Sequence, residues 1–376
     1  MNFEQEFNKG QTGANKGLPM GLGVDHISSA VNGVQRSRIY GVAAAAKAGK
    51  STFVDYAFVL EPILYVMKHN IQAEWLYFSF ELDRVSKEFD FAAYFLGKFH
   101  GIRHIKLEDG ITKDGKDIIP LTSDYLRGRV QDDNSEIIKV KDSIKKVLFD
   151  DIYPNWIIPI MGEFDKNGEQ KSKGYINFIE QKDNPTGIYK GLKGKAEREG
   201  KWITVNIGGG RTRITGYKPN DPEKYVIIIT DHLRKLIPER GFDMKRTVDK
   251  YIEYQVELRN LCGYTFVDII HTNRSITDQQ RLQQAKDLLY PTSDDIKDTG
   301  NLAEDADYIF SMFDPNDQRY RLKKHFGLEL LDSKGNPFYP DMKTIHLVES
   351  RHCKYPQHFR VNMIGGVKHF EKLKIN

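Results

Sequence analysis

Short apolar runs alternate with longer amphipathic segments along most of the chain. A buried strand needs only a few consecutive apolar residues, whereas a helix places them at every third or fourth position, so this pattern predicts strands that alternate with helices. The predicted strands are 38–43, 74–80, 156–161, 225–230, 265–271, 308–313, 344–349 and, as the last, 359–363. The predicted helices are 52–68, 83–100, 185–200 and a segment in which Val248, Ile252 and Val256 recur at helical spacing, with further helical character around 136–149. Such alternation indicates an α/β fold with a mostly parallel central sheet flanked by helices.

Two parts of the chain depart from this pattern. Residues 1–36 are weakly patterned and rich in Gly, Asn and Gln, which predicts an N-terminal arm or linker before a domain of residues 37–376. Within that domain, insertions are expected near 162–184 and 202–218. The second is predicted to be a β-hairpin, because two alternating runs flank Gly208, Gly209 and Gly210.

The hairpin lies in a basic stretch. Between Lys182 and Lys218 there are nine Lys or Arg residues against three Asp or Glu residues. Two interpretations stay open at this point: a solvated surface elaboration, or a patch that faces nucleic acid.

Composition excludes several classes of protein. With 39% hydrophobic and 29% charged residues, the chain is not disordered throughout. Its two cysteines exclude a disulfide framework and favour a reducing compartment. The N-terminus lacks the apolar core of a signal peptide, and no run approaches the length of a membrane span. We therefore expect a cytoplasmic protein with no membrane partner. A net charge of +4 permits a nucleic-acid partner without indicating one.

The most informative segment is AAAKAGKST, which fits the phosphate-binding loop G-x-x-x-x-G-K-[ST]. It comprises Ala44, Ala45, Ala46, Lys47, Ala48, Gly49, Lys50, Ser51 and Thr52, with Ala44 where the first glycine is usual. In such a loop, backbone N–H groups and the start of a helix surround phosphate oxygens. Lys50 is expected to reach the β- and γ-phosphates of ATP and the Ser51 hydroxyl to bind Mg²⁺, whereas the Lys47 side chain has no assigned role. The alternative is an alanine-rich helix start that contains G-K-S by chance.

Two carboxylates complete the expected nucleotide site. Asp231 follows the apolar run VIII and Thr230, which is the Walker B pattern of a carboxylate aimed at the Mg²⁺ shell. Glu81 directly follows LYFSF, at a strand end where it could polarise or deprotonate the attacking water. The alternative for Glu81 is an acidic residue at the start of a helix, stabilised by the helix dipole.

In this order, the motifs resemble the ATPase domain of the DnaB-type replicative ring helicases, which has a RecA-like fold. RIYGVAAAAKAGKST is similar to that family's first strand and phosphate loop, LYFSFEL to its F-S-L-E-M strand, and IIITDHLRKL to its Walker B strand. DIIHTNRS is similar to the sensor strand, and HLVESRHCKYPQHFRV to the late hairpin with the arginine finger. The most specific match is DDIKDTGNLAEDADYIF, which follows the family's D-L-R-E-S-G-x-I-E-x-D-A-D block. The resemblance covers roughly residues 17–372.

The resemblance implies further roles. His271 would sense the γ-phosphate, and Arg351 would reach into the site of the neighbouring subunit of a hexameric ring. Lys297, Asp298 and Gly300 match the loop that grips the backbone of single-stranded DNA in the central channel, a sequence-independent and salt-sensitive mode. The implied setting is the cytoplasm of a bacterium or a phage-infected host, with a primase or a helicase loader as further partners.

Three features depart from the family pattern. The separate N-terminal collar domain is expected to be missing, Glu349 stands where the family usually has a lysine before the finger, and the hairpin at 202–218 is extra.

Three classes of function are consistent with these motifs to different degrees. The sequence favours an ATP-driven helicase motor that translocates on single-stranded DNA during replication. The alternative is a RecA-like DNA-dependent ATPase without unwinding activity, such as a recombinase, a helicase loader or another replication ATPase. A non-catalytic scaffold is disfavoured, because Lys50, Ser51, Glu81 and Asp231 are all intact.

Overall fold

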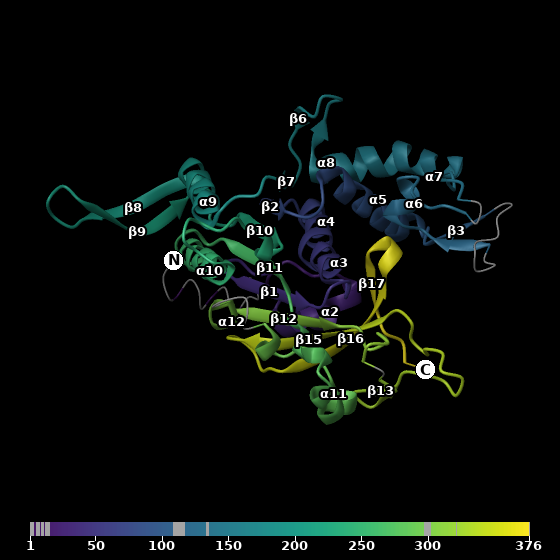
Figure 1. Ribbon diagram of the computed structural model, residues 1–376. Helices are drawn as coiled ribbons and strands as arrows, with labels where there is room; N and C mark the ends of the chain where they lie inside the picture. The colour runs from purple at the N-terminus through teal and green to yellow at the C-terminus, as the bar shows by residue number, and fades with distance from the viewer. Residues whose placement is uncertain are drawn as a thin grey trace.

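The computed structural model describes residues 4, 8, 11, 16–107, 117–132, 135–296, 302–320 and 322–375, with the backbone alone for residues 274, 275 and 279. A nine-stranded sheet crosses the molecule in the order β17–β16–β15–β12–β1–β11–β10–β2–β7 (Figure 1). Its strands are β1 (Ile39–Ala44), β2 (Ala73–Ser79), β7 (Ile176–Ile179), β10 (Tyr225–Asp231), β11 (Thr265–His271), β12 (Tyr308–Phe313), β15 (Met342–Ser350), β16 (Gln357–Ile364) and β17 (His369–Lys372). The pairs from β12 to β7 are parallel, and the pairs from β12 to β17 are antiparallel. The predicted mostly parallel α/β sheet is therefore confirmed.

Helices cover both faces of this sheet (Figure 1). The α-helices are α2 (Asp25–Val31), α3 (Lys50–Val54), α4 (Glu61–His69), α5 (Arg84–His100), α6 (Ser123–Leu126), α7 (Asp142–Val147), α8 (Ile158–Met161), α9 (Pro185–Glu199), α10 (Met244–Cys262), α11 (Gln279–Ala285) and α12 (Leu302–Asp305). Two π-helical segments, Asp55–Leu60 and Leu148–Ile157, join α3 to α4 and α7 to α8. Short 3₁₀ turns occupy Leu22–Val24, Leu233–Lys235, Arg274–Thr277, Lys286–Leu288, Ser293–Asp295 and Gly365–Val367. Side-chain caps set the starts of α5, α9 and α10, because Asp83, Asn184 and Asp243 each accept a hydrogen bond from a backbone N–H in the first turn.

The alternation of side chains along β1 divides the interior into two cores. Tyr40 and Val42 point to the face that α3, α4 and α5 cover, where they belong to the larger apolar cluster. Ile39 and Ala43 point to the opposite face and pack with residues of α9 and α10. Because successive side chains of a strand alternate between faces, an uninterrupted apolar run is what a strand buried on both sides requires.

The segment 156–161 was predicted to be a strand, and this prediction is wrong. Its residues end the π-helical segment and form α8, with Pro159 in the first turn. Trp156 stacks on Phe99 of α5 with ring centroids 4.3 Å apart. A short apolar run is compatible with a buried helix as well as a strand, and periodicity alone does not separate them. The strand of this region is β7, which lies within the predicted insertion 162–184 and adds to the edge of the main sheet.

Two ends of the domain also differ from the prediction. Part of the predicted arm is packed, since Leu18, Met20, Val24 and Ile27 are buried in the larger core. At the other end, 359–363 is not the last strand, because β17 follows it and pairs with β16.

The described residues also form two-stranded sheets that are separate from the main sheet. They are β3 (His104–Lys106) with β4 (Ile118–Pro120), β5 (Glu163–Phe164) with β6 (Gln170–Ser172), β8 (Gly200–Asn206) with β9 (Thr212–Pro219), and β13 (Lys324–His325) with β14 (Leu328–Glu329). The predicted hairpin at 202–218 is thus confirmed as β8–β9. Within the described ranges, no helix combines the length and the apolar character needed to cross a membrane.

Candidate nucleotide site

The predicted phosphate loop connects a buried strand to a helix, as the motif requires. β1 ends at Ala44 and α3 begins at Lys50. The backbone has positive φ at Lys47 (64°) and at Gly49 (95°). The positive φ of Gly49 is what favours glycine at this position, and a Cβ atom there would also lie 2.5 Å from the sulfur of Met363, whose side chain would have to move.

The register of the sheet brings the other predicted residues to the same edge. Ala44 pairs with His271 across β1 and β11, and Asp231 pairs with Ser79 across β10 and β2. These strands are parallel, so their carboxyl ends meet where the phosphate loop begins. Glu81 follows two residues after the end of β2 and reaches the same place.

Lys50 and Asp231 are both buried at this edge. Lys50 is 8% exposed and Asp231 is 3% exposed. Burial lowers the pKa of the Lys50 ammonium, and the charges of Asp231 and Glu81 oppose that shift. The charges of Asp231 and Glu81 therefore lie close enough to Lys50 to affect its pKa.

The donor set fits a magnesium ion. Among the described residues, the Oδ1 atom of Asp231 is buried without a hydrogen-bond partner, as is the hydroxyl of Thr272, which directly follows His271. A buried carboxylate oxygen left free in this way is suited to a hard cation that prefers oxygen ligands. Ser51, which the motif predicts as the second oxygen ligand, lies in the first turn of α3.

Glu81 is held by a histidine that the sequence analysis did not single out. His232 Nε2 lies 3.1 Å from Glu81 Oε1, and Lys235 Nζ lies 3.6 Å from the same oxygen. Partial burial raises the pKa of Glu81, but His232 and Lys235 outweigh that effect and hold the pKa below its usual value. The only sequence signal for His232 was its position directly after Asp231.

His232 also contacts His271. Their rings lie edge to face with centroids 4.5 Å apart. Burial lowers the pKa of both imidazoles, and that of His271 falls to about 4. The His271 ring is therefore neutral near pH 7. Donor atoms of Glu81, His232 and His271 lie within 4.8 Å of one another, a spacing that would also allow this trio to hold a nitrogen-preferring metal ion.

Arg351 lies at the other end of the sheet. It follows β15, whose Ser350 pairs with Tyr308 at the start of β12, and Tyr308 pairs with Tyr40 near the start of β1. Ala44, where the phosphate loop begins, is four residues further along β1, a separation of about 13 Å along the strand. The Arg351 guanidinium donates to the backbone oxygen of Glu304 instead. It does not join the phosphate loop of its own chain.

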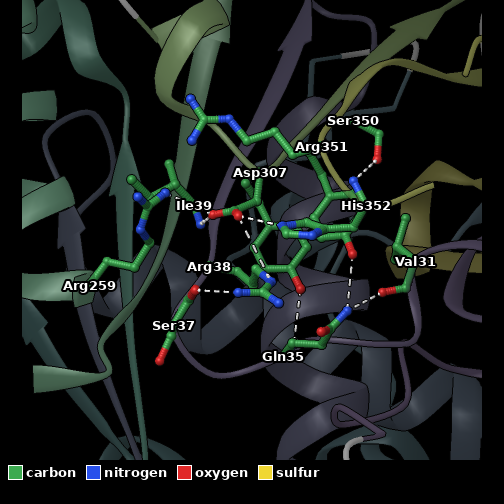
Figure 2. A network of polar contacts seen from close by, with 12 residues as sticks. Val31, Gln35, Ser37, Arg38, Ile39, Arg259, Asp307, Ser350, Arg351 and His352 are labelled. Carbon is green, nitrogen blue, oxygen red and sulfur yellow. Dashed lines mark hydrogen bonds and ion pairs between the residues drawn. The ribbon is translucent and has the colours of Figure 1, made fainter. Parts of the chain in front are cut away.

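A buried carboxylate, Asp307, organises the surroundings of Arg351 (Figure 2). Its oxygens accept from the Ile39 backbone N–H at 2.9 Å and from Arg259 at 3.1 Å, and one lies 2.6 Å from His352 Nε2. Its backbone oxygen accepts from the N–H of Arg351 at 3.0 Å. Asp307 thus ties the base of the β15–β16 hairpin to the first residue of β1. Asp307 lies within the DDIKDTGNLAEDADYIF block, but the sequence alone indicated no role for it.

The predicted DNA-binding residues Lys297, Asp298 and Gly300 fall outside the described residues.

The sequence matches no protein-family model and no curated protein. The structure, however, superimposes on a solved ATPase domain of a DnaB-like helicase with a TM-score of 0.62, over 99% of this chain and 97% of that one. It also superimposes, with a TM-score of 0.58, on a DnaB-like replicative helicase whose structure concerns its interactions with primase, over 95% of this chain and 64% of that one. The chain has the fold of a DnaB-type helicase ATPase domain. Sequence identity to both is 12%, so the likeness to these DnaB-type structures concerns the backbone fold and not individual residues.

Proposed function

We propose that this chain is the ATP-driven motor of a DnaB-type DNA helicase that translocates on single-stranded DNA during replication. The observation that carries the proposal is the convergence of Lys50, Asp231 and Glu81 at one sheet edge, on a fold of the DnaB type. A chance G-K-S sequence would not be expected to meet a buried Walker B carboxylate and a strand-end glutamate in this way.

Each residue has a separate task in the proposed reaction. Backbone N–H groups of residues 44–52 would surround the phosphates, and Lys50 would contact the β- and γ-phosphates. Ser51 and Asp231 would hold Mg²⁺, which neutralises phosphate charge when bound. Glu81 would accept a hydrogen bond from the attacking water and orient it, and His271 would contact the γ-phosphate.

The remaining positive charge of the proposed nucleotide site would come from a second chain. Arg351 lies too far along the sheet to serve its own Lys50, so we propose that it completes the site of a neighbouring subunit in a hexameric ring. Stabilisation of transition-state charge by such a finger contributes about 10³–10⁵-fold in related phosphoryl transfer. In the free chain it pairs with Asp305 at 3.7 Å, an exposed contact that a phosphate could replace.

The proposal extends to the partners. Lys297, Asp298 and Gly300 would grip single-stranded DNA in the channel, and a primase or a loader would bind the ring. The setting would be the cytoplasm of a bacterium or a phage-infected host.

The decisive experiment compares assembly and activity. The chain would be incubated with Mg-ATP and single-stranded DNA, and ATP hydrolysis and unwinding of a forked duplex would be measured, with Lys50→Ala as the control. Electron microscopy with a non-hydrolysable ATP analogue would show the assembly. Closed rings and fork unwinding support the helicase. DNA-stimulated hydrolysis with open filaments and no unwinding would instead identify the alternative, a RecA-like ATPase of the recombinase or loader class.

A further inference from the structure

The β8–β9 hairpin projects from the body of the molecule and contains no acidic residue (Figure 1). Its 20 residues, Gly200 to Pro219, include four cations: Lys201, Arg211, Arg213 and Lys218. All four are exposed, and the structure gives none of them a carboxylate partner among the described residues. By contrast, the nearby Lys195 and Lys224 are each paired with Glu74 and Glu199.

The register of the hairpin puts these four cations on one face. Lys201 lies opposite Lys218, and Val205 lies opposite Arg213. A bulge in β9 lies between these two pairs. Residues directly opposite each other share a face, and so do alternate residues of one strand. By the same rule Ile203, Val205 and Ile207 lie on this face, and they are 52%, 49% and 59% exposed. The cationic face therefore consists of an exposed apolar strip with cations along its length.

The other face anchors the hairpin. Trp202 and Tyr217 lie opposite each other, with ring centroids 5.0 Å apart. The Tyr217 hydroxyl donates to the backbone oxygen of Ala196 in α9 at 2.8 Å, and Lys193 of α9 lies over the Trp202 ring. The base of the hairpin is thus fixed to the domain, which holds the cationic face in one orientation toward solvent.

The tip of the hairpin consists of three glycines and therefore carries no side chains. Gly208, Gly209 and Gly210 all have positive φ, and a Cβ atom on any of them would meet nothing within 4 Å. The tip can therefore approach a surface closely without a side chain in between.

We propose that the cationic face of the β8–β9 hairpin binds the backbone of duplex DNA. Cations on a hairpin without acidic residues, none of them with a carboxylate partner among the described residues, attract a polyanion, and the choice of DNA among polyanions rests on the proposed function. The choice of duplex rests on shape. A two-stranded ribbon fits the major groove, and seven residues of strand extend about 23 Å, which is longer than the groove is wide. The β-branched strip could there contact thymine methyl groups.

The site would be separate from the ATP site. β9 leads into the N-terminal end of β10, whereas Asp231 and the phosphate loop lie at the carboxyl ends of the strands. Changes on the cationic face should therefore leave the nucleotide site intact.

The test is a variant that carries Lys201→Ala, Arg211→Ala, Arg213→Ala and Lys218→Ala. Binding of a labelled blunt duplex and of a labelled single strand would be measured over a range of salt concentrations. Each lost phosphate contact should reduce the slope of log affinity against log salt for the duplex by about 0.9, and duplex affinity at low salt should fall roughly tenfold or more. Single-strand binding should change much less.

Two control variants make the result specific. Thr204→Ala with Thr212→Ala alters exposed side chains on the opposite face and should bind duplex normally. Arg211→Lys with Arg213→Lys keeps the charge and should retain most of the binding and its salt slope. Thermal unfolding of each variant verifies that the domain is folded.

Unchanged duplex affinity and slope in the fourfold variant would overturn the proposal and leave an acidic protein surface as the partner. Equal losses for duplex and single strand would overturn the assignment to duplex. The outcome is independent of the proposed motor: duplex binding without ATP hydrolysis would contradict the proposed function alone, and hydrolysis without hairpin-dependent duplex binding would contradict this inference alone.

Discussion

Glu81 combines partial exposure with a fixed orientation. His232 and Lys235 both contact the same carboxylate oxygen, while the carboxyl group remains exposed enough to meet a water molecule. Both partners favour the charged form, which is the form that can act as a base.

The first prediction follows from this arrangement. Glu81→Gln should bind ATP with nearly unchanged affinity but hydrolyse it at least about 100-fold more slowly, because an amide orients water poorly and accepts no proton. Lys50→Ala should instead lose nucleotide binding together with hydrolysis. Equilibrium binding of a fluorescent ATP analogue and steady-state turnover separate the two. Normal turnover in Glu81→Gln would show that another group is the base.

The second prediction concerns His232, which we expect to position Glu81. His232→Ala should lower kcat by about tenfold, since a hydrogen bond to a charged group is removed, while KM for ATP stays close to the wild-type value. His232→Gln retains a donor and should recover part of the loss. A change confined to KM, or no recovery with glutamine, would argue against a positioning role.

At the scale of single residues, the sequence was informative where a motif has fixed spacing. Lys50 and Ser51 could be proposed because they have fixed places in the phosphate-loop motif, and Glu81 and Asp231 because each stands at the end of a visible apolar run. His232 and Asp307 could not, because their roles come from contacts with residues far away in the chain. No local pattern distinguishes a histidine that holds a distant glutamate from one that faces solvent.

At the scale of elements, β11 and α10 share an ionisable group in their common core. Asp268 is fully buried, one of its oxygens accepts from Gln255 at 3.1 Å, and the other has no partner among the described residues. Burial raises the pKa of Asp268 from 3.8 to about 7, although Gln255 and Thr230 partly offset the effect.

The third prediction is a pH dependence of stability. The pKa of Asp268 is higher in the folded chain than in the unfolded chain, so this carboxyl group favours folding when it is protonated. Its contribution to stability is fully present below about pH 4 and is lost as the pH rises toward and through 7. At about 1.4 kcal/mol per pKa unit, the loss amounts to about 4 kcal/mol. Asp268→Asn cannot ionise, so it should gain stability relative to wild type at pH 8 and much less at pH 5. Chemical unfolding at both pH values measures this, and an equal difference at the two would mean that Asp268 does not titrate in this window.

The elements themselves were predicted well where pattern and length agree. Strands such as 225–230 and 308–313 have clear boundaries, and the helices at 83–100 and 185–200 begin next to Asp83 and Asn184, which cap them. The prediction for the segment 156–161 was wrong because its apolar run suits the helix that packs against α5 as well as it suits a strand. The packing of the N-terminal residues could not be predicted for a related reason, since their apolar side chains are too sparse to show a period but are buried by the rest of the domain.

At the scale of the whole molecule, the two halves of the proposed catalytic machinery lie at opposite ends of β1 and β12. The order of motifs along the chain was enough to predict the layered fold. It was not enough to predict where Arg351 lies relative to Lys50, because that depends on the antiparallel return of β15 beside β12.

The fourth prediction tests a site shared between chains. Arg351→Ala should bind ATP almost normally but hydrolyse it poorly, because the guanidinium acts mainly on charge in the transition state. Mixed with Lys50→Ala, it should regain partial activity, since some contacts would combine an intact Lys50 with an intact Arg351. Activity per chain should also rise with protein concentration in the wild type.

A mixture that stays inactive although mixed assembly is verified would exclude a finger supplied by a neighbour, and so would a fully active monomer. Glu349, two residues before Arg351, offers a second check. Replacing it by lysine introduces the cation that the resemblance to the DnaB type leads us to expect there, and hydrolysis should be unchanged or faster, whereas Arg351→Lys should remain slow.

The placement of Lys50 and Arg351 at opposite ends of the same strands has a consequence for stoichiometry. A contact that joins the two uses a different surface on each chain, so two chains cannot satisfy it mutually. A pair of chains would complete one ATP site and leave one phosphate loop and one arginine exposed at its ends. An open filament would always have one complete site fewer than it has chains, and only a closed ring would complete them all. The fraction of bound ATP that is hydrolysed in a single turnover would therefore be lower in an assembly with free ends than in a closed ring.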